Sequence, residues 1–145
     1  MKYIKSILTV LAAALIYTTP AVAAEFVVIV NKANPVAHLP KSIVAKYFSM
    51  DLVFWDDGKK VIPVDLVDSN PLARQFAQAI LEMDLDKKRR IWLTKIFAGK
   101  AAPPQQLKTD EAVIAVVSAE PGAIGYIAKS SFTDKVKIVI VDEQP

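Results

Sequence analysis

The sequence has 145 residues, of which 53% are hydrophobic, and its 18 Lys and Arg against 15 Asp and Glu give a formal net charge of +3. It contains no cysteine, which excludes disulfide bridges, thiolate nucleophiles and thiolate metal ligands. Its single histidine, His38, stands in a proline-rich segment with no acidic partner nearby, which argues against a metal centre or a catalytic triad. We therefore expect neither an enzyme nor a protein that carries a metal or a cofactor.

The first 24 residues have the order of a secretory signal peptide. Lys2 and Lys5 precede an apolar stretch at 7–17, and Pro20 is followed by small residues at 21–24, where cleavage is expected. The alternative is a retained signal anchor, but the apolar stretch is shorter than the roughly 20 residues that cross a bilayer. We expect residues 25–145 to be one periplasmic domain that does not span a membrane.

Removal of this segment changes the charge balance. Two of the 18 cationic residues and none of the 15 acidic ones lie in it, so 16 cations and 15 acids remain, a net charge of +1. Nucleic-acid binding needs a clustered basic surface, and export to the periplasm argues against it as well. Nucleic acid is therefore not an expected partner.

Apolar runs bounded by turn residues predict strands, and apolar residues three and four apart predict helices. The expected elements are strands at 26–30, 61–66, 123–127 and 136–141, and helices at 41–48, from Ser69–Pro71 onward, from Asp86 to Gly99, and at 110–119. Pro63 has no N–H to donate, which predicts that its strand lies at an edge of the sheet or pairs elsewhere. Strands separated by helices are typical of a mostly parallel sheet covered on both faces, so we expect an α/β fold.

The helix from Asp86 to Gly99 begins with the only basic run of the chain, at 87–90. Successive helical residues are rotated by about 100°, so these charges spread around the axis and are expected to be solvated. Asp86 is the expected N-cap. The residues expected to face inward are Trp92, Leu93, Ile96 and Phe97.

The best candidate for a binding site is the start of the helix at Ser69, Asn70 and Pro71, together with Arg74. A helix N-terminus offers unpaired N–H groups and a partial positive charge, which suit an oxyanion. Ser69 could add a hydroxyl group and Arg74 a bidentate donor. The alternative is an ordinary helix cap made by Ser69, with Arg74 on the surface or paired with Asp68.

Several short motifs follow one another along the chain. They are Val28-Ile29-Val30-Asn31, Lys46-Tyr47-Phe48, Trp55-Asp56-Asp57, Ile62-Pro63-Val64, Ser69 with Phe76, Trp92, and Pro121-Gly122-Ala123-Ile124-Gly125-Tyr126, the last being the most specific. Their order is similar to that in the second lobe of the phosphate ABC-transporter substrate-binding proteins. The resemblance implies one lobe of a type-2 periplasmic-binding-protein fold, with a mostly parallel sheet flanked by helices, and an exported binding role.

The sequence departs from this family in two respects. The family's anion loop resembles an Arg followed by Ser-Gly-Thr, whereas the equivalent stretch here keeps Ser69 and lacks the Arg, the Gly and the Thr. About 121 residues also make only one of the two lobes that close over a ligand, and an open lobe leaves a bound anion hydrated.

Two functions therefore stay open. The first is binding of phosphate or a similar oxyanion through Ser69, Asn70 and Arg74, linked to ABC-type transport or sensing. The second is a non-enzymatic accessory protein that kept the fold, lost the ligand, and docks on a membrane transporter or sensor.

Overall fold

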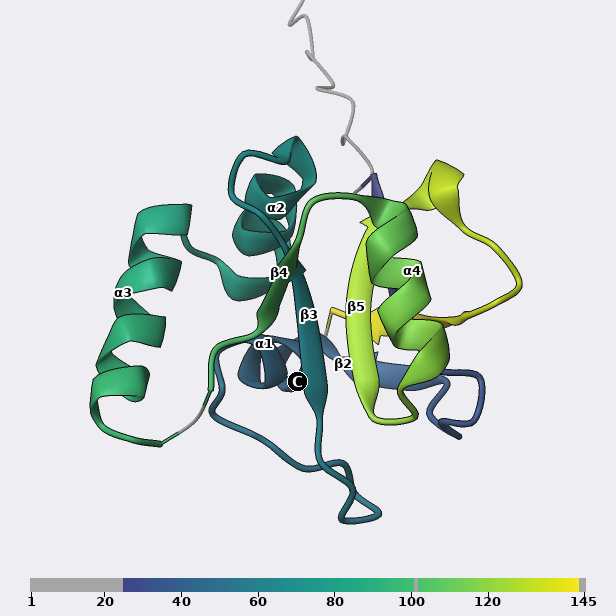
Figure 1. Ribbon diagram of the computed structural model, residues 1–145, viewed down its shortest axis with the longest axis horizontal. Helices are drawn as coiled ribbons and strands as arrows, with labels where there is room; N and C mark the ends of the chain where they lie inside the picture. The colour runs from purple at the N-terminus through teal and green to yellow at the C-terminus, as the bar shows by residue number, and fades with distance from the viewer. Residues whose placement is uncertain (1–24, 101, 144–145) are drawn as a thin grey trace, which may run out of the picture.

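The protein is described by a computed structural model that covers residues 25–100 and 102–143, and its centre is a six-stranded sheet (Figure 1). The strands are β1 (Phe26–Val30), β2 (His38–Pro40), β3 (Ile62–Leu66), β4 (Gln105–Leu107), β5 (Ala123–Ala128) and β6 (Lys137–Asp142). Their order in the sheet is β2-β6-β1-β5-β3-β4. β1 is antiparallel to β5 and β6, and the other three pairings are parallel, so five strands share one direction. The expected α/β class with a mostly parallel sheet is confirmed.

Helices cover both faces of this sheet. They are α1 (Lys41–Phe48), α2 (Pro71–Phe76) with the π-helix η1 (Ala77–Leu81), α3 (Leu85–Phe97), α4 (Asp110–Ala119) and the 3-10 turn η2 (Lys129–Ser131). Neighbouring residues of β5 contact helices on opposite faces of the sheet, because successive side chains of a strand point to opposite faces. Gly125 faces Val113 of α4, whereas the ring of Tyr126 stacks on Phe76 of α2, with 3.9 Å between the ring centroids.

The motif Pro121-Gly122-Ala123-Ile124-Gly125-Tyr126 requires its two glycines for close packing. A Cβ atom on Gly122 would lie 2.3 Å from the carbonyl oxygen of Lys60, and one on Gly125 would lie 2.8 Å from Cγ1 of Val113. The indole of Trp55 also donates a 2.9 Å hydrogen bond to the carbonyl of Gly122. These contacts bring the segment before β3 and helix α4 against β5.

Two details of the sheet differ from expectation. The short strands β2 and β4 lie in segments for which no strand was predicted. β3 lies between β5 and β4, so of the two alternatives predicted from Pro63 the edge position is wrong. Pro63 is tolerated there because it pairs with Ile124 of β5, and the pairing with β4 begins only at Val64. The missing N–H of Pro63 therefore costs no bond to β4.

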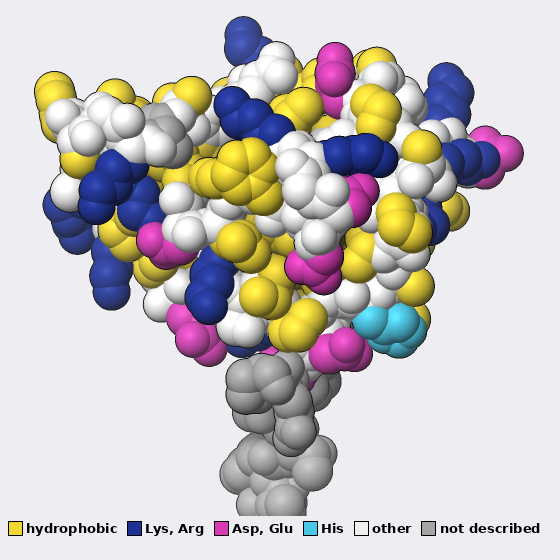
Figure 2. Space-filling model, turned by 90° about the horizontal axis from the view of Figure 1, so that it is seen from below, with side chains coloured by type: hydrophobic (Ala, Val, Ile, Leu, Met, Phe, Trp, Pro, Cys, Tyr) yellow, Lys and Arg dark blue, Asp and Glu magenta, His cyan; other side chains and the backbone are white. Residues whose placement is uncertain are grey.

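Helix α3 lies at the side of the molecule, at the left of Figure 1, and not against the sheet. Of the four residues expected to face inward, only Trp92 is buried; Leu93, Ile96 and Phe97 are 51%, 39% and 87% exposed. Figure 2 shows Lys and Arg side chains gathered beside hydrophobic ones at this end of the molecule. The prediction that Leu93, Ile96 and Phe97 face inward was wrong. Apolar spacing alone does not show that α1 and α2 already cover the sheet.

A few polar anchors hold α3 to the body. The indole of Trp92 donates a 2.9 Å hydrogen bond to the carbonyl of Phe48, and the ammonium group of Lys95 contacts Ser49 and Asp51. The helix is capped by Asp84, whose carboxylate accepts a 2.7 Å hydrogen bond from the Lys87 amide, and not by Asp86 as expected. Asp86 instead lies in the first turn.

The predicted signal peptide lies outside the described residues. Within residues 25–100 and 102–143, no helix has both the length and the apolar character needed to cross a bilayer.

Candidate functional site

The end of β3 carries a buried ion pair that the sequence pattern did not reveal. The ammonium group of Lys88 lies 2.7 Å from the carboxylate of Asp65 and 3.1 Å from that of Asp68. The side chains of Lys88 and Asp65 are each only 2% exposed. The Tyr126 hydroxyl donates a hydrogen bond to the Asp65 carboxylate. This cluster connects α3 to the carboxyl end of β3 and to the aromatic core.

Lys88 was expected to be solvated, and this expectation was wrong. Its partners lie 20 and 23 residues earlier in the chain, so no local spacing predicts the contact. Burial is tolerable because both carboxylates satisfy the ammonium group, and no buried side-chain N or O atom among the described residues lacks a hydrogen-bond partner. Burial, followed by the nearby Asp65 charge, raises the pKa of Tyr126, so this hydroxyl stays protonated and remains a donor.

The start of α2 uses its backbone amides within the protein. Asn70 is the N-cap in place of Ser69, and its side-chain oxygen accepts a 3.0 Å hydrogen bond from the Leu72 amide. The amide of Asn70 donates to the carbonyl of Val67, and that of Ala73 donates to the carbonyl of Asn70. Pro71 has no N–H. Three backbone donors at this helix start, the amides of Asn70, Leu72 and Ala73, are therefore already bonded within the protein.

A solvent-open cavity of about 470 Å³ lies beside this helix start. Its lining residues are Asp68, Ser69, Arg74, Gln78, Asp84, Leu85, Asp86 and Arg89. Ser69 and Arg74 therefore line one cavity, whereas Asn70 is not part of its lining. The side-chain Nδ2 of Asn70 donates a 3.4 Å hydrogen bond to the carbonyl of Lys108. Arg74 takes part in none of the ion pairs found within residues 25–100 and 102–143.

The charges in this cavity favour neither a free anion nor a cation. Three carboxylates face two guanidinium groups, and Arg89 is already paired with Asp68, at 3.1 Å, and with Asp86. An anion would meet the repulsion of Asp84 and Asp86 with only Arg74 left to bind it. In the described part of the chain, no three His, Asp or Glu groups are arranged to hold a metal ion.

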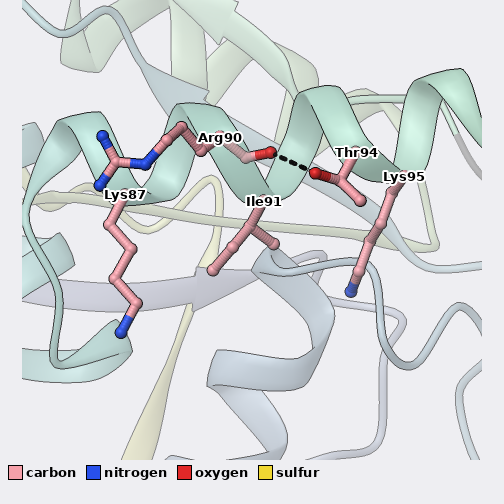
Figure 3. Close-up of a pocket in the computed structure, with 5 residues that line it drawn as sticks. All are labelled: Lys87, Arg90, Ile91, Thr94 and Lys95. Atoms are coloured by element: carbon pink, nitrogen blue, oxygen red, sulfur yellow. Dashed lines mark hydrogen bonds between the residues drawn. The ribbon is translucent and has the colours of Figure 1, made fainter.

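Two other hollows lie near α3. One is a mainly apolar groove of about 500 Å³, which residues of the loop at 50–54 and the start of β3 line together with Pro103. The other is a shallow hollow on the helix itself, where Lys87, Ile91 and Lys95 point to the same side (Figure 3). The Thr94 hydroxyl donates to the Arg90 carbonyl in this view, so it is occupied within the helix.

No protein-family model matches the sequence, and no curated protein matches it. Solved structures do match the fold. An ABC-type phosphate transport receptor from Vibrio cholerae aligns with a TM-score of 0.66 and 17% identity over 79% of this chain. PstS from Borrelia burgdorferi aligns with a TM-score of 0.63 and 18% identity over 83% of this chain. The chain has the periplasmic-binding-protein fold.

The match covers only part of these structures. The aligned region is 45% of the Vibrio protein and 48% of the Borrelia protein, so this chain spans slightly less than half of their length. At identities below 20% the likeness establishes the fold, and function has to be argued from the site.

Proposed function

We propose that the protein is an exported, non-enzymatic accessory protein that uses the binding-protein fold to dock on a transporter or sensor of the cell envelope. The main observation that supports this role above phosphate binding is that the amides of Asn70, Leu72 and Ala73 at the start of α2 are bonded within the protein. Asn70 occupies the Leu72 amide and Pro71 supplies none. An anion at this helix start would have to displace existing hydrogen bonds, which lowers its affinity.

The buried Lys88 supports the same role. It places an ammonium group at the carboxyl end of β3, and in open α/β sheets ligands bind outside the carboxyl ends of strands. The carboxylates of Asp65 and Asp68 neutralise this cation within the protein. The charged groups at the end of β3 therefore balance one another without a bound ligand.

Isothermal titration calorimetry with inorganic phosphate near neutral pH tests this proposal. We expect no saturable heat up to millimolar phosphate, and Arg74→Ala should behave like the parent protein. Lys108→Ala is a matched control, because it removes an exposed cation near the helix start that lies outside the cavity.

The second candidate is binding of phosphate or another oxyanion through Ser69, Asn70 and Arg74. It is favoured by one observation, that Ser69 and Arg74 line the same solvent-open cavity and Arg74 has no acidic partner among the described ion pairs. Saturable binding that Arg74→Ala abolishes and Lys108→Ala preserves would establish this candidate and overturn the accessory role.

A further inference from the structure

The outer surface of α3 combines exposed apolar side chains with cations. Residues spaced by three and four share a helix face, and Arg90, Leu93 and Phe97 lie opposite the anchoring residues Lys88 and Trp92. Phe97 is 87% exposed, so most of its ring stands clear of the protein. Ile96 is 39% exposed at the edge of the same surface. We call Arg90, Leu93, Ile96, Phe97 and Lys100 the docking face.

The cations of this face are free of acidic partners. Within residues 25–100 and 102–143, the ion pairs of α3 involve Lys88, Arg89 and Lys95 and not Arg90. Lys100, which follows the helix after Ala98 and Gly99, is also exposed and takes part in none of these pairs. Arg90 before Leu93 and Lys100 after Phe97 are therefore cations without an ion-pair partner among the residues that the structure describes, and the exposed Asp86, one turn before Arg90, is paired with Arg89.

We propose that the docking face binds the surface of a bilayer that contains anionic phospholipids. Phe97, Leu93 and Ile96 would enter the boundary between headgroups and acyl chains, while Arg90 and Lys100 would contact headgroup phosphates. The charges are complementary to an anionic surface. A protruding ring fits a yielding lipid layer. An acidic helix or peptide would instead need an apolar groove, and the groove near α3 is lined by residues of the loop at 50–54 and the start of β3 and not by Leu93, Ile96 or Phe97. This binding would hold the accessory protein beside a membrane partner.

Cosedimentation with lipid vesicles tests the proposal. We expect the purified protein to sediment with vesicles of mixed phosphatidylglycerol and phosphatidylcholine, to stay in solution with pure phosphatidylcholine, and to be released by added salt. Phe97→Ser should lower the partition coefficient about tenfold, because burial of one aromatic ring is lost. Arg90→Gln and Lys100→Gln should each lower it about fivefold.

Matched controls come from the other side of the molecule. Phe132, which is 41% exposed in the segment after η2, serves as Phe132→Ser, and the exposed Lys135 serves as Lys135→Gln. Both should keep the parent's partition coefficient, and far-UV circular dichroism should show that every variant is folded.

The proposal is overturned if mixed vesicles do not sediment the protein, which would point to a protein partner for α3. It is equally overturned if Phe97→Ser and Phe132→Ser give the same partition coefficient. Phosphate titration reports on Arg74 and not on this face, so the two proposals fail separately.

Discussion

Lys88 is the residue on which the attachment of α3 depends. A buried ammonium group next to two carboxylates contributes little net stability as an intact pair, but removal of one partner leaves an uncompensated buried charge. Lys88→Met should therefore lower the free energy of unfolding by about 3 to 5 kcal/mol. Urea denaturation at pH 7 measures this loss.

The neighbouring Lys87 provides the control for this prediction. Its side chain is exposed, so Lys87→Met should change the free energy of unfolding by less than about 0.5 kcal/mol. The double variant Lys88→Met with Asp65→Leu should recover stability, since it removes both buried charges. Equal stability of Lys88→Met and Lys87→Met would show that the ion pair at β3 is not formed.

Tyr126 gives the protein a specific weakness at alkaline pH. Burial raises the pKa of its hydroxyl above the ordinary value of 10.0, so the folded state binds this proton more tightly than the unfolded state does. The stability from this group is fully present below pH 10 and is lost as the pH rises above it. Urea denaturation between pH 8 and 11 should show this decline, and Tyr126→Phe should reduce its slope. An unchanged slope would contradict the burial of a protonated Tyr126 beside Asp65. Tyr47, whose pKa is also raised by burial and then by the charge of Asp56, should contribute to the decline that remains.

At the scale of elements, β5 depends on two glycines that differ in what surrounds them. A Cβ atom at position 122 would meet the backbone of Lys60, which cannot move aside, whereas one at 125 would meet the methyl groups of Val113 and Val117. Gly122→Ala should therefore cost at least about 2 kcal/mol of unfolding free energy and Gly125→Ala about 1 kcal/mol. Thermal denaturation of the two variants gives the order, and the reverse order would contradict the packing around Gly122.

Helices α3 and α4 should differ in stability because they differ in burial. α4 buries Val113, Ile114 and Val117 against the sheet, whereas α3 buries only Lys88 and Trp92. Local opening requires less energy where few apolar contacts break. Hydrogen exchange followed by mass spectrometry should show faster amide exchange at 85–97 than at 110–119. Lys88→Met should accelerate the first region further, and equal protection of both helices would contradict the loose attachment of α3.

At the scale of the whole molecule, the sequence predicts the layers better than it predicts the site. The strand at 26–30 and the helices at 41–48 and 110–119 have the expected bounds, because apolar periodicity depends on near neighbours. The burial of Lys88 depends on Asp65 and Asp68, and the cap at Asn70 replaces Ser69 through one hydrogen bond to Leu72. Such long-range pairs and single-residue choices leave no periodic signal.

The fold alone does not assign phosphate binding to this chain, since the matched structures are about twice as long. The central claim is that the amides of Asn70, Leu72 and Ala73 at the start of α2 are bonded within the protein and bind no anion. Titration of inorganic phosphate into 15N-labelled protein, followed by amide NMR, tests it most directly. The account predicts that the amides from Ser69 to Arg74 shift no more with phosphate than with sodium chloride of equal ionic strength. Saturable shifts confined to these amides would contradict it.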